Sequence, residues 1–165
     1  MFDHLKTELK LRELEIDSNV NIANVSDTTF TTVINTLYRI KFVGTVISNK
    51  QLTSLLTKVL NEGTSIEKFI LHRISIPKVH PNILGPGLAQ FLEVDISASV
   101  MAEQQKGTFF FSILDTKKVR RLNLEQCDLT SVNFVILATA VSCVERANLA
   151  QVLSCVESND YSLQF

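Results

Sequence analysis

The sequence has no excess of charge of either sign and no long apolar run. Its 165 residues carry 16 Lys and Arg against 17 Asp and Glu, a formal net charge of -1. Because a basic excess is what neutralises nucleic-acid phosphates, we expect no nucleic-acid partner. No apolar run approaches the roughly 18 to 20 residues that a membrane span requires, and residues 1–10 lack the apolar core of a signal peptide. We therefore expect no membrane partner and a cytoplasmic location.

Cysteine and histidine are scarce, with three of each. Cys127, Cys143 and Cys155 are separated by 16 and 12 residues, which matches no pair of zinc ligands, and the three histidines are not spaced as ligands either. Three cysteines are also too few for a secreted disulfide scaffold. We therefore expect no metal and no cofactor.

Glycine is rare as well, and the one glycine-rich stretch is Gly85-Pro86-Gly87. A phosphate-binding loop needs successive backbone N–H donors and usually a following Lys with Ser or Thr, and neither condition is met here. The stretch predicts a turn that breaks a short helix near residues 82–90. Since no nucleophile motif such as GxSxG is present and the acidic residues fall on separate units, we expect no enzymatic activity.

Short apolar triplets of the form apolar-x-x-apolar-x-apolar recur along the whole chain. Their first members are separated by 26, 29, 25, 28 and 25 residues. A period in this range is the signature of a repeat architecture, in which each unit buries its apolar face against its neighbours. The six triplets are Leu11/Leu14/Ile16, Leu37/Ile40/Phe42, Ile66/Phe69/Leu71, Phe91/Val94/Ile96, Val119/Leu122/Leu124 and Val144/Ala147/Leu149.

Between the triplets the apolar spacing becomes helical. Residues 52–60 carry leucine or valine at i, i+3, i+4, i+7 and i+8, and Gly63 follows where a left-handed cap would end a helix. Phe134, Val135 and Ala138 begin a similar, shorter pattern. Each unit is therefore predicted to contain a short strand, a turn and one helix.

Two α/β architectures are built from such units. A doubly wound sheet buries both faces of its strands, which then read as continuous apolar runs. Here the positions between the apolar ones are charged, as at Arg39 and Lys41 or at Glu93 and Asp95. A solenoid leaves one face of its sheet in water because its helices cover only the other face, so we expect the solenoid.

The pattern resembles the leucine-rich repeats of the ribonuclease-inhibitor class, which also occur at the C-terminal end of NOD-like receptors. The best match is residues 119–130, with Cys127 where that family places Asn or Cys, and Asn19 holds the same position in the first unit. The other units have a different residue there: Thr45, Ile74, Ser99 and Val152. The resemblance implies a right-handed βα horseshoe of about six repeats, with parallel strands on the concave face and helices on the convex face.

We expect a single domain over residues 1–165. Residues 1–10 are expected to form a capping helix, residues 11–149 the repeats, and residues 150–165 the C-terminal edge or an incomplete repeat. Because a terminal unit needs a polar cap and residues 150–165 stay apolar, three alternatives are open. The segment folds back over the last strand, the chain is part of a longer array, or the edge forms a symmetric contact by self-association.

Four positions expected on the concave face are apolar: Tyr38, Val43, Ile70 and Leu92. They fall in the second to fourth units, where strands about 4.8 Å apart would bring them together as an exposed cluster. An apolar centre with a charged rim is typical of a protein-binding surface. The candidate binding residues are Tyr38, Arg39, Lys41, Val43, Lys68, Ile70, His72, Leu92, Glu93, Asp95 and Arg121.

The sequence thus favours a non-enzymatic protein–protein interaction module that presents a rigid concave surface to a protein partner. Three alternatives remain open. One is a catalytic α/β domain with its site at the carboxyl ends of the strands. Another is a ligand-sensing repeat segment of a larger protein of the NOD-like-receptor type. The third is a purely structural segment whose concave face contacts nothing.

Overall fold

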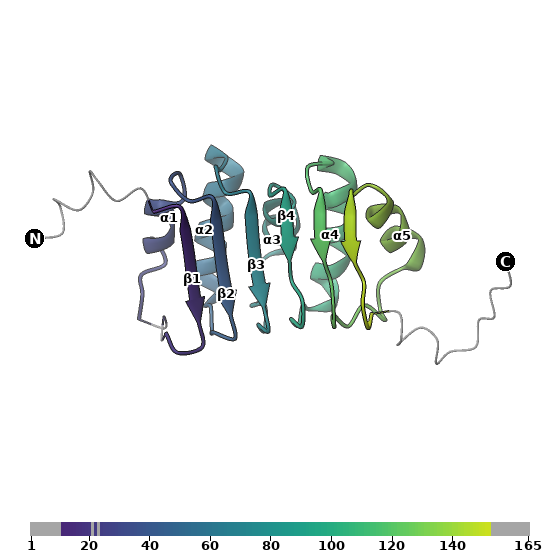
Figure 1. The fold of residues 1–165 in the computed structure, drawn as a ribbon, viewed down its shortest axis with the longest axis horizontal. Helices are drawn as coiled ribbons and strands as arrows, with labels where there is room; N and C mark the ends of the chain where they lie inside the picture. The colour runs from purple at the N-terminus through teal and green to yellow at the C-terminus, as the bar shows by residue number, and fades with distance from the viewer. Residues whose placement is uncertain (1–10, 21, 23, 153–165) are drawn as a thin grey trace, which may run out of the picture.

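The computed structural model describes residues 11–20, 22 and 24–152, and in this part of the chain strands and helices alternate (Figure 1). The predicted capping helix at residues 1–10 and most of the predicted C-terminal edge, from residue 153 on, lie outside the described residues. The elements are β1 (Glu13–Asp17), α1 (Thr29–Val33), β2 (Arg39–Val43), α2 (Asn49–Glu62), β3 (Lys68–His72), α3 (Pro81–Leu88), β4 (Glu93–Asp95), α4 (Glu103–Thr116), β5 (Arg121–Asn123), α5 (Phe134–Ser142) and β6 (Arg146–Asn148). Every helix in these ranges is too short or too polar to cross a bilayer.

Over the described ranges, the strands form one open parallel sheet of six strands in chain order, β1 to β6. Leu14 pairs with Ile40, Ile40 with Phe69, and the same register continues to Ala147 in β6. The strand spacing therefore equals the spacing of the apolar triplets. Figure 1 shows the helices behind the sheet, on one of its two faces. The predicted α/β class, with parallel strands alternating with helices, is confirmed.

The core lies between the sheet and its helices. Phe42, Phe69 and Phe91 are fully buried, and the last two rings stack with centroids 4.7 Å apart. On α2 the predicted stripe is buried from Leu52 to Val59, whereas its last member, Leu60, is 37% exposed, and Gly63 ends this helix with a positive φ. Since burial of one such side chain contributes about 1.5–3 kcal/mol, this layer supplies most of the stabilising free energy.

Two buried glutamines tie successive units together through backbone carbonyls. Gln51 of α2 donates from Nε2 to the carbonyl oxygens of Ile22 and Val25, at 2.9 and 2.8 Å. Gln105, at the same helical position in α4, donates in the same way to the carbonyls of Pro77 and Val79. Each glutamine thereby satisfies loop carbonyls that would otherwise be buried without a donor.

The turns after the strands are held by a second set of contacts. Thr45, Ser99 and Cys127 each donate from the side chain to a backbone carbonyl of the preceding unit, over 3.3, 2.7 and 3.0 Å. Ile74 and Val152, at the corresponding positions, are buried but have no donor group in their side chains. The ladder of side-chain hydrogen bonds along this edge is therefore interrupted.

The prediction of a turn at Gly85-Pro86-Gly87 is wrong, because α3 continues through all three residues. The glycines serve packing instead. A Cβ at Gly85 would lie 2.8 Å from the carbonyl oxygen of Thr108 in α4, and one at Gly87 would lie 2.9 Å from Cβ of Leu56 in α2. α3 is held this closely between its two neighbours because both positions lack a side chain.

We predict that Gly85→Ala lowers the free energy of unfolding by about 1–3 kcal/mol, since the added methyl group must displace a backbone oxygen of α4. Gly107→Ala is the matched control, because a Cβ there meets nothing within 4 Å. Replacing that helical glycine should raise stability by about 0.5–1 kcal/mol. Urea unfolding followed by circular dichroism measures both, and a Gly85→Ala chain as stable as the native one would contradict the packing of α3.

Candidate functional site

The face of the sheet that carries no helices, here called the open face, presents alternate strand residues to solvent. Each strand buries one set of side chains and turns the other set outward. β2 shows this directly, because Ile40 and Phe42 are fully buried while Arg39, Lys41 and Val43 are only half-buried. The open face is therefore where the chain displays its charged strand residues.

On the β1 side of the open face, the charged residues of β2 form ion pairs with those of β1. Arg39 contacts the carboxylate of Glu13 at 3.3 Å, and Lys41 contacts that of Glu15 at 2.8 Å. Both pairs join residues that lie directly opposite each other in the parallel register. These two predicted site residues are thus engaged with their own chain.

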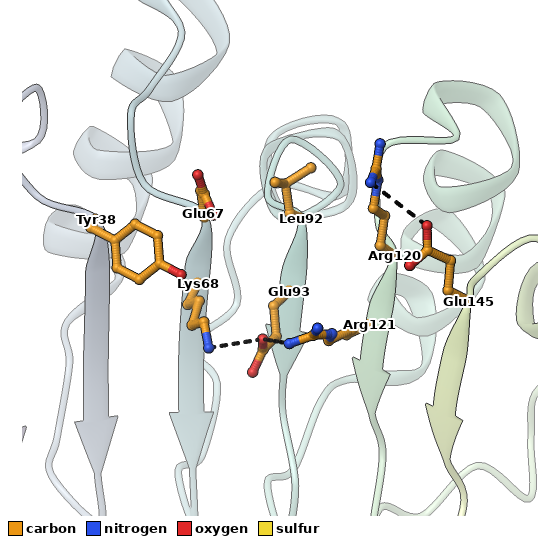
Figure 2. A pocket seen from close by; sticks show the side chains of 8 residues that line it. All are labelled: Tyr38, Glu67, Lys68, Leu92, Glu93, Arg120, Arg121 and Glu145. Atoms are coloured by element: carbon orange, nitrogen blue, oxygen red, sulfur yellow. Dashed lines mark hydrogen bonds and ion pairs between the residues drawn. The ribbon is translucent and has the colours of Figure 1, made fainter.

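A hollow of about 220 Å³ lies on the open face at the amino ends of the strands, and we call it the amino-end hollow (Figure 2). Its residues lie at the first position of a strand or just before it. The backbone continues the sheet ladder there, since Glu67 N–H donates to Tyr38 C=O and Arg120 N–H to Leu92 C=O. The lining residues are Tyr38, Glu67, Lys68, Leu92, Glu93, Arg120, Arg121 and Glu145.

Paired charges form one border of this hollow. The Glu93 carboxylate contacts Lys68 Nζ at 3.3 Å and an Arg121 guanidinium nitrogen at 3.4 Å, so it bridges two neighbouring strands. Arg120 and Glu145 contact each other at 3.7 Å. Because all these side chains are partly or largely exposed, each pair contributes only about 0–1 kcal/mol to stability. Their main effect is to fix where charge is displayed.

The hollow also contains apolar surface and one unpaired charge. Tyr38 and Leu92 are 38% and 37% exposed, so both side chains keep apolar area that a partner could cover. Glu67 lies between them in the row of residues that precedes β2, β3 and β4. Among the described lining residues, its carboxylate is the one charged group without a hydrogen-bond or ion-pair partner.

The structure brings together only part of the predicted site. Five of the eleven predicted residues line the amino-end hollow: Tyr38, Lys68, Leu92, Glu93 and Arg121. Toward the carboxyl ends of the strands, Asp95 accepts a hydrogen bond from Asn123 at 3.1 Å and lines a second depression of about 250 Å³. Val43 and His72 are half-buried at the carboxyl ends of β2 and β3.

The prediction that Ile70 is an exposed member of an apolar cluster is wrong, because Ile70 is only 7% exposed. It points to the open face but sits at the centre of β3. Lys41 and Asp95 flank it on the neighbouring strands, and Lys68 and His72 flank it along its own strand. Neighbours about 5 Å away across the sheet and roughly 6.6 Å away along the strand cover a residue in the middle of a sheet, whereas Tyr38 and Leu92 at the rim stay accessible.

Three lining residues were absent from the predicted site: Glu67, Arg120 and Glu145. A signal for them existed in the sequence. Each follows directly after the first apolar residue of its triplet, the same relative position as Tyr38 and Leu92. Because these positions share one row of the sheet, two exposed apolar members of the row indicate that the charged members belong to the same surface.

The titratable groups of the described residues do not assemble into a metal site, since no three His, Cys, Asp or Glu side chains come together within that part of the chain. Cys127 is buried and donates to the carbonyl of Ile96, and burial raises the pKa of its thiol. The neutral thiol is the form that donates this hydrogen bond, so Cys127 acts as a packed turn residue.

Comparison of the chain with protein-family models, with curated proteins and with solved structures finds no match.

Proposed function

We propose that the chain is a leucine-rich-repeat solenoid whose open face binds a partner protein. The repeat assignment is supported by the strand register, which matches the 25- to 29-residue spacing of the apolar triplets. It is supported further by the placement of the helices on one face of the sheet (Figure 1). In this proposal the open face is the concave face of a right-handed horseshoe.

The observation that carries the binding proposal is the composition of the amino-end hollow. Two half-exposed apolar side chains, Tyr38 and Leu92, stand beside charged groups that are already positioned by contacts with one another. An apolar centre with a polar border is the anatomy of a binding hot spot. Because the sheet fixes these side chains before a partner arrives, little conformational entropy is lost on binding.

An enzymatic alternative would use the carboxyl ends of the strands, where His72 Nδ1 and Ser97 Oγ lie 2.8 Å apart. Ser97 is only 4% exposed, and its N–H is held by the Asp95 carboxylate. A buried hydroxyl of this kind offers no room for the attack on a substrate carbonyl that a serine nucleophile must make. We therefore propose a non-enzymatic protein. From its sequence we propose further that it acts in the cytoplasm and without a cofactor.

We predict that Tyr38→Glu together with Leu92→Glu abolishes capture of the partner from a cytosolic extract. Each substitution places a charge where a partner side chain would exclude water, and loss of one such contact costs about 2 kcal/mol or more. Native and variant chains are immobilised in parallel, the proteins retained are identified by mass spectrometry, and the affinity of each purified candidate is then measured.

Val46→Glu together with Val100→Glu is the matched control, since these valines are 79% and 69% exposed and lie outside the hollow. This variant should retain the partner. If the hollow variant retains the same protein as the native chain, or if the control loses it equally, the hollow is not the binding site.

We also propose that the edge formed by α5 and β6 associates with a second copy of the chain or with further units of the same architecture. Phe134 and Val135 of α5 are 61% and 68% exposed, more than any other phenylalanine and most other valines among the described residues. Over the described ranges, the far side of β6 pairs with no strand. An apolar helix beside an unpaired strand edge is a surface prone to association.

We expect the native chain to self-associate in a concentration-dependent manner in sedimentation velocity. Phe134→Glu with Val135→Glu should weaken this association more than about tenfold, because burial of each side chain contributes about 1.5–3 kcal/mol. Phe111→Glu, at a position 57% exposed on α4, serves as the control and should leave association unchanged. A native chain that stays monomeric at every concentration would contradict self-association.

A further inference from the structure

The charged residues that line the amino-end hollow differ in whether they contact a residue of opposite charge. Lys68 and Arg121 share the carboxylate of Glu93, and Arg120 contacts Glu145. Each cation that lines the hollow therefore has an anionic neighbour on its own chain. An acidic partner would have to compete with Glu93 or Glu145 for these cations, which opposes its binding.

Glu67 is the exception, because its exposed carboxylate has no partner among the described residues. Figure 2 shows its side chain extending away from the Lys68, Glu93 and Arg121 group, at the level of Leu92. The ladder of backbone hydrogen bonds places Glu67 on the strand between those that carry Tyr38 and Leu92. The free negative charge thus lies in one row with an aromatic residue on the preceding strand and an aliphatic residue on the following strand, and Figure 2 shows the Tyr38 ring extending toward Lys68, below the Glu67 carboxylate.

We propose that the amino-end hollow binds an arginine side chain of a basic segment in the partner protein, with Glu67 as its counter-ion. This inference rests on the proposed function and specifies the partner chemistry at the same site. An arginine side chain has a suitable group for each of the three residues, Glu67, Tyr38 and Leu92. It donates two parallel hydrogen bonds to a carboxylate, it stacks on the face of an aromatic ring, and its methylene stem packs on aliphatic surface. Lysine would provide the charge and the stem but a weaker contact with the Tyr38 ring.

The hollow has a volume that suits this occupant. About 220 Å³ is below the roughly 300–1,000 Å³ of pockets that enclose a whole small-molecule ligand, so the hollow is better suited to a single side chain. The partner would therefore reach the hollow with a single extended side chain, while its backbone contacts the surrounding charged rows of the open face.

The test selects ligands from a phage-displayed library of random linear peptides, using the folded native chain as bait. We expect the selected peptides to share an arginine. Replacing that arginine by citrulline, which is uncharged and nearly isosteric, should weaken binding of the synthetic peptide by about 10- to 100-fold, as expected when a charged hydrogen-bonded pair is lost.

Three variants test whether the arginine of the peptide binds at Glu67. Glu67→Gln should lose the same 10- to 100-fold in affinity for the arginine peptide, since it keeps the shape of the side chain and removes its charge. Asp115→Asn, at an exposed site on α4, is the matched control for the lost charge and should bind as the native chain does. Glu67→Arg, used as bait in a new selection, should select peptides rich in Asp and Glu.

The outcomes separate this inference from the function on which it rests. Selected peptides that depend on Tyr38 and Leu92, but lack a shared basic residue and bind Glu67→Gln normally, would overturn the arginine site and leave the binding surface in place. Peptides that bind the Tyr38→Glu, Leu92→Glu variant as well as the native chain, or no enrichment over that variant, would overturn both.

Discussion

A parallel strand that buries every second side chain under a helix must turn the remaining side chains to the opposite face. This constraint organises the described part of the chain, because all six strands of the sheet follow it in one register. Burial of Ile40 in β2 and Phe69 in β3 leaves Arg39 and Lys68 side by side on the open face. The apolar layer supplies the stability, while the open face is free to carry charges that contribute little to folding. The candidate site is therefore a consequence of where the core lies.

The same constraint explains why the hollow forms at the amino ends of the strands. In the middle of β3, residues on all sides cover Ile70, so even an apolar residue there is inaccessible. At the rim, the row that contains Tyr38, Glu67 and Leu92 comes just before the first residues of β2, β3 and β4 (Figure 2), and Tyr38 and Leu92 are 38% and 37% exposed. Side chains at this level can reach over the adjoining strand without being covered. The exposed apolar side chains of the hollow, Tyr38 and Leu92, therefore lie where the backbone ladder continues beyond the ends of the strands.

Much of this arrangement could be predicted from the sequence, because it depends on periodicity. The triplet spacing gave the register of the strands, and the alternation of apolar and charged residues gave the face that each residue occupies.

Periodicity does not encode which residues surround a given side chain. The burial of Ile70 depends on the lengths of residues on adjoining strands, and the helical state of Gly85-Pro86-Gly87 depends on how closely α2 and α4 approach. The unpaired state of Glu67 likewise emerges only when the partners of Lys68, Arg120 and Arg121 are known. These properties are pairwise and tertiary, so a single sequence read along its length does not contain them explicitly.

We propose that a partner protein binds at the amino-end hollow, and side-chain footprinting tests this proposal most directly. Hydroxyl radicals oxidise accessible Tyr and Leu side chains, so the chain is exposed to them with and without the purified partner. We expect partner binding to protect Tyr38 and Leu92, while Phe111 on α4, which is 57% exposed, is oxidised equally in both samples. Unchanged oxidation of Tyr38 and Leu92 in the complex, with protection on the helical side instead, would contradict it.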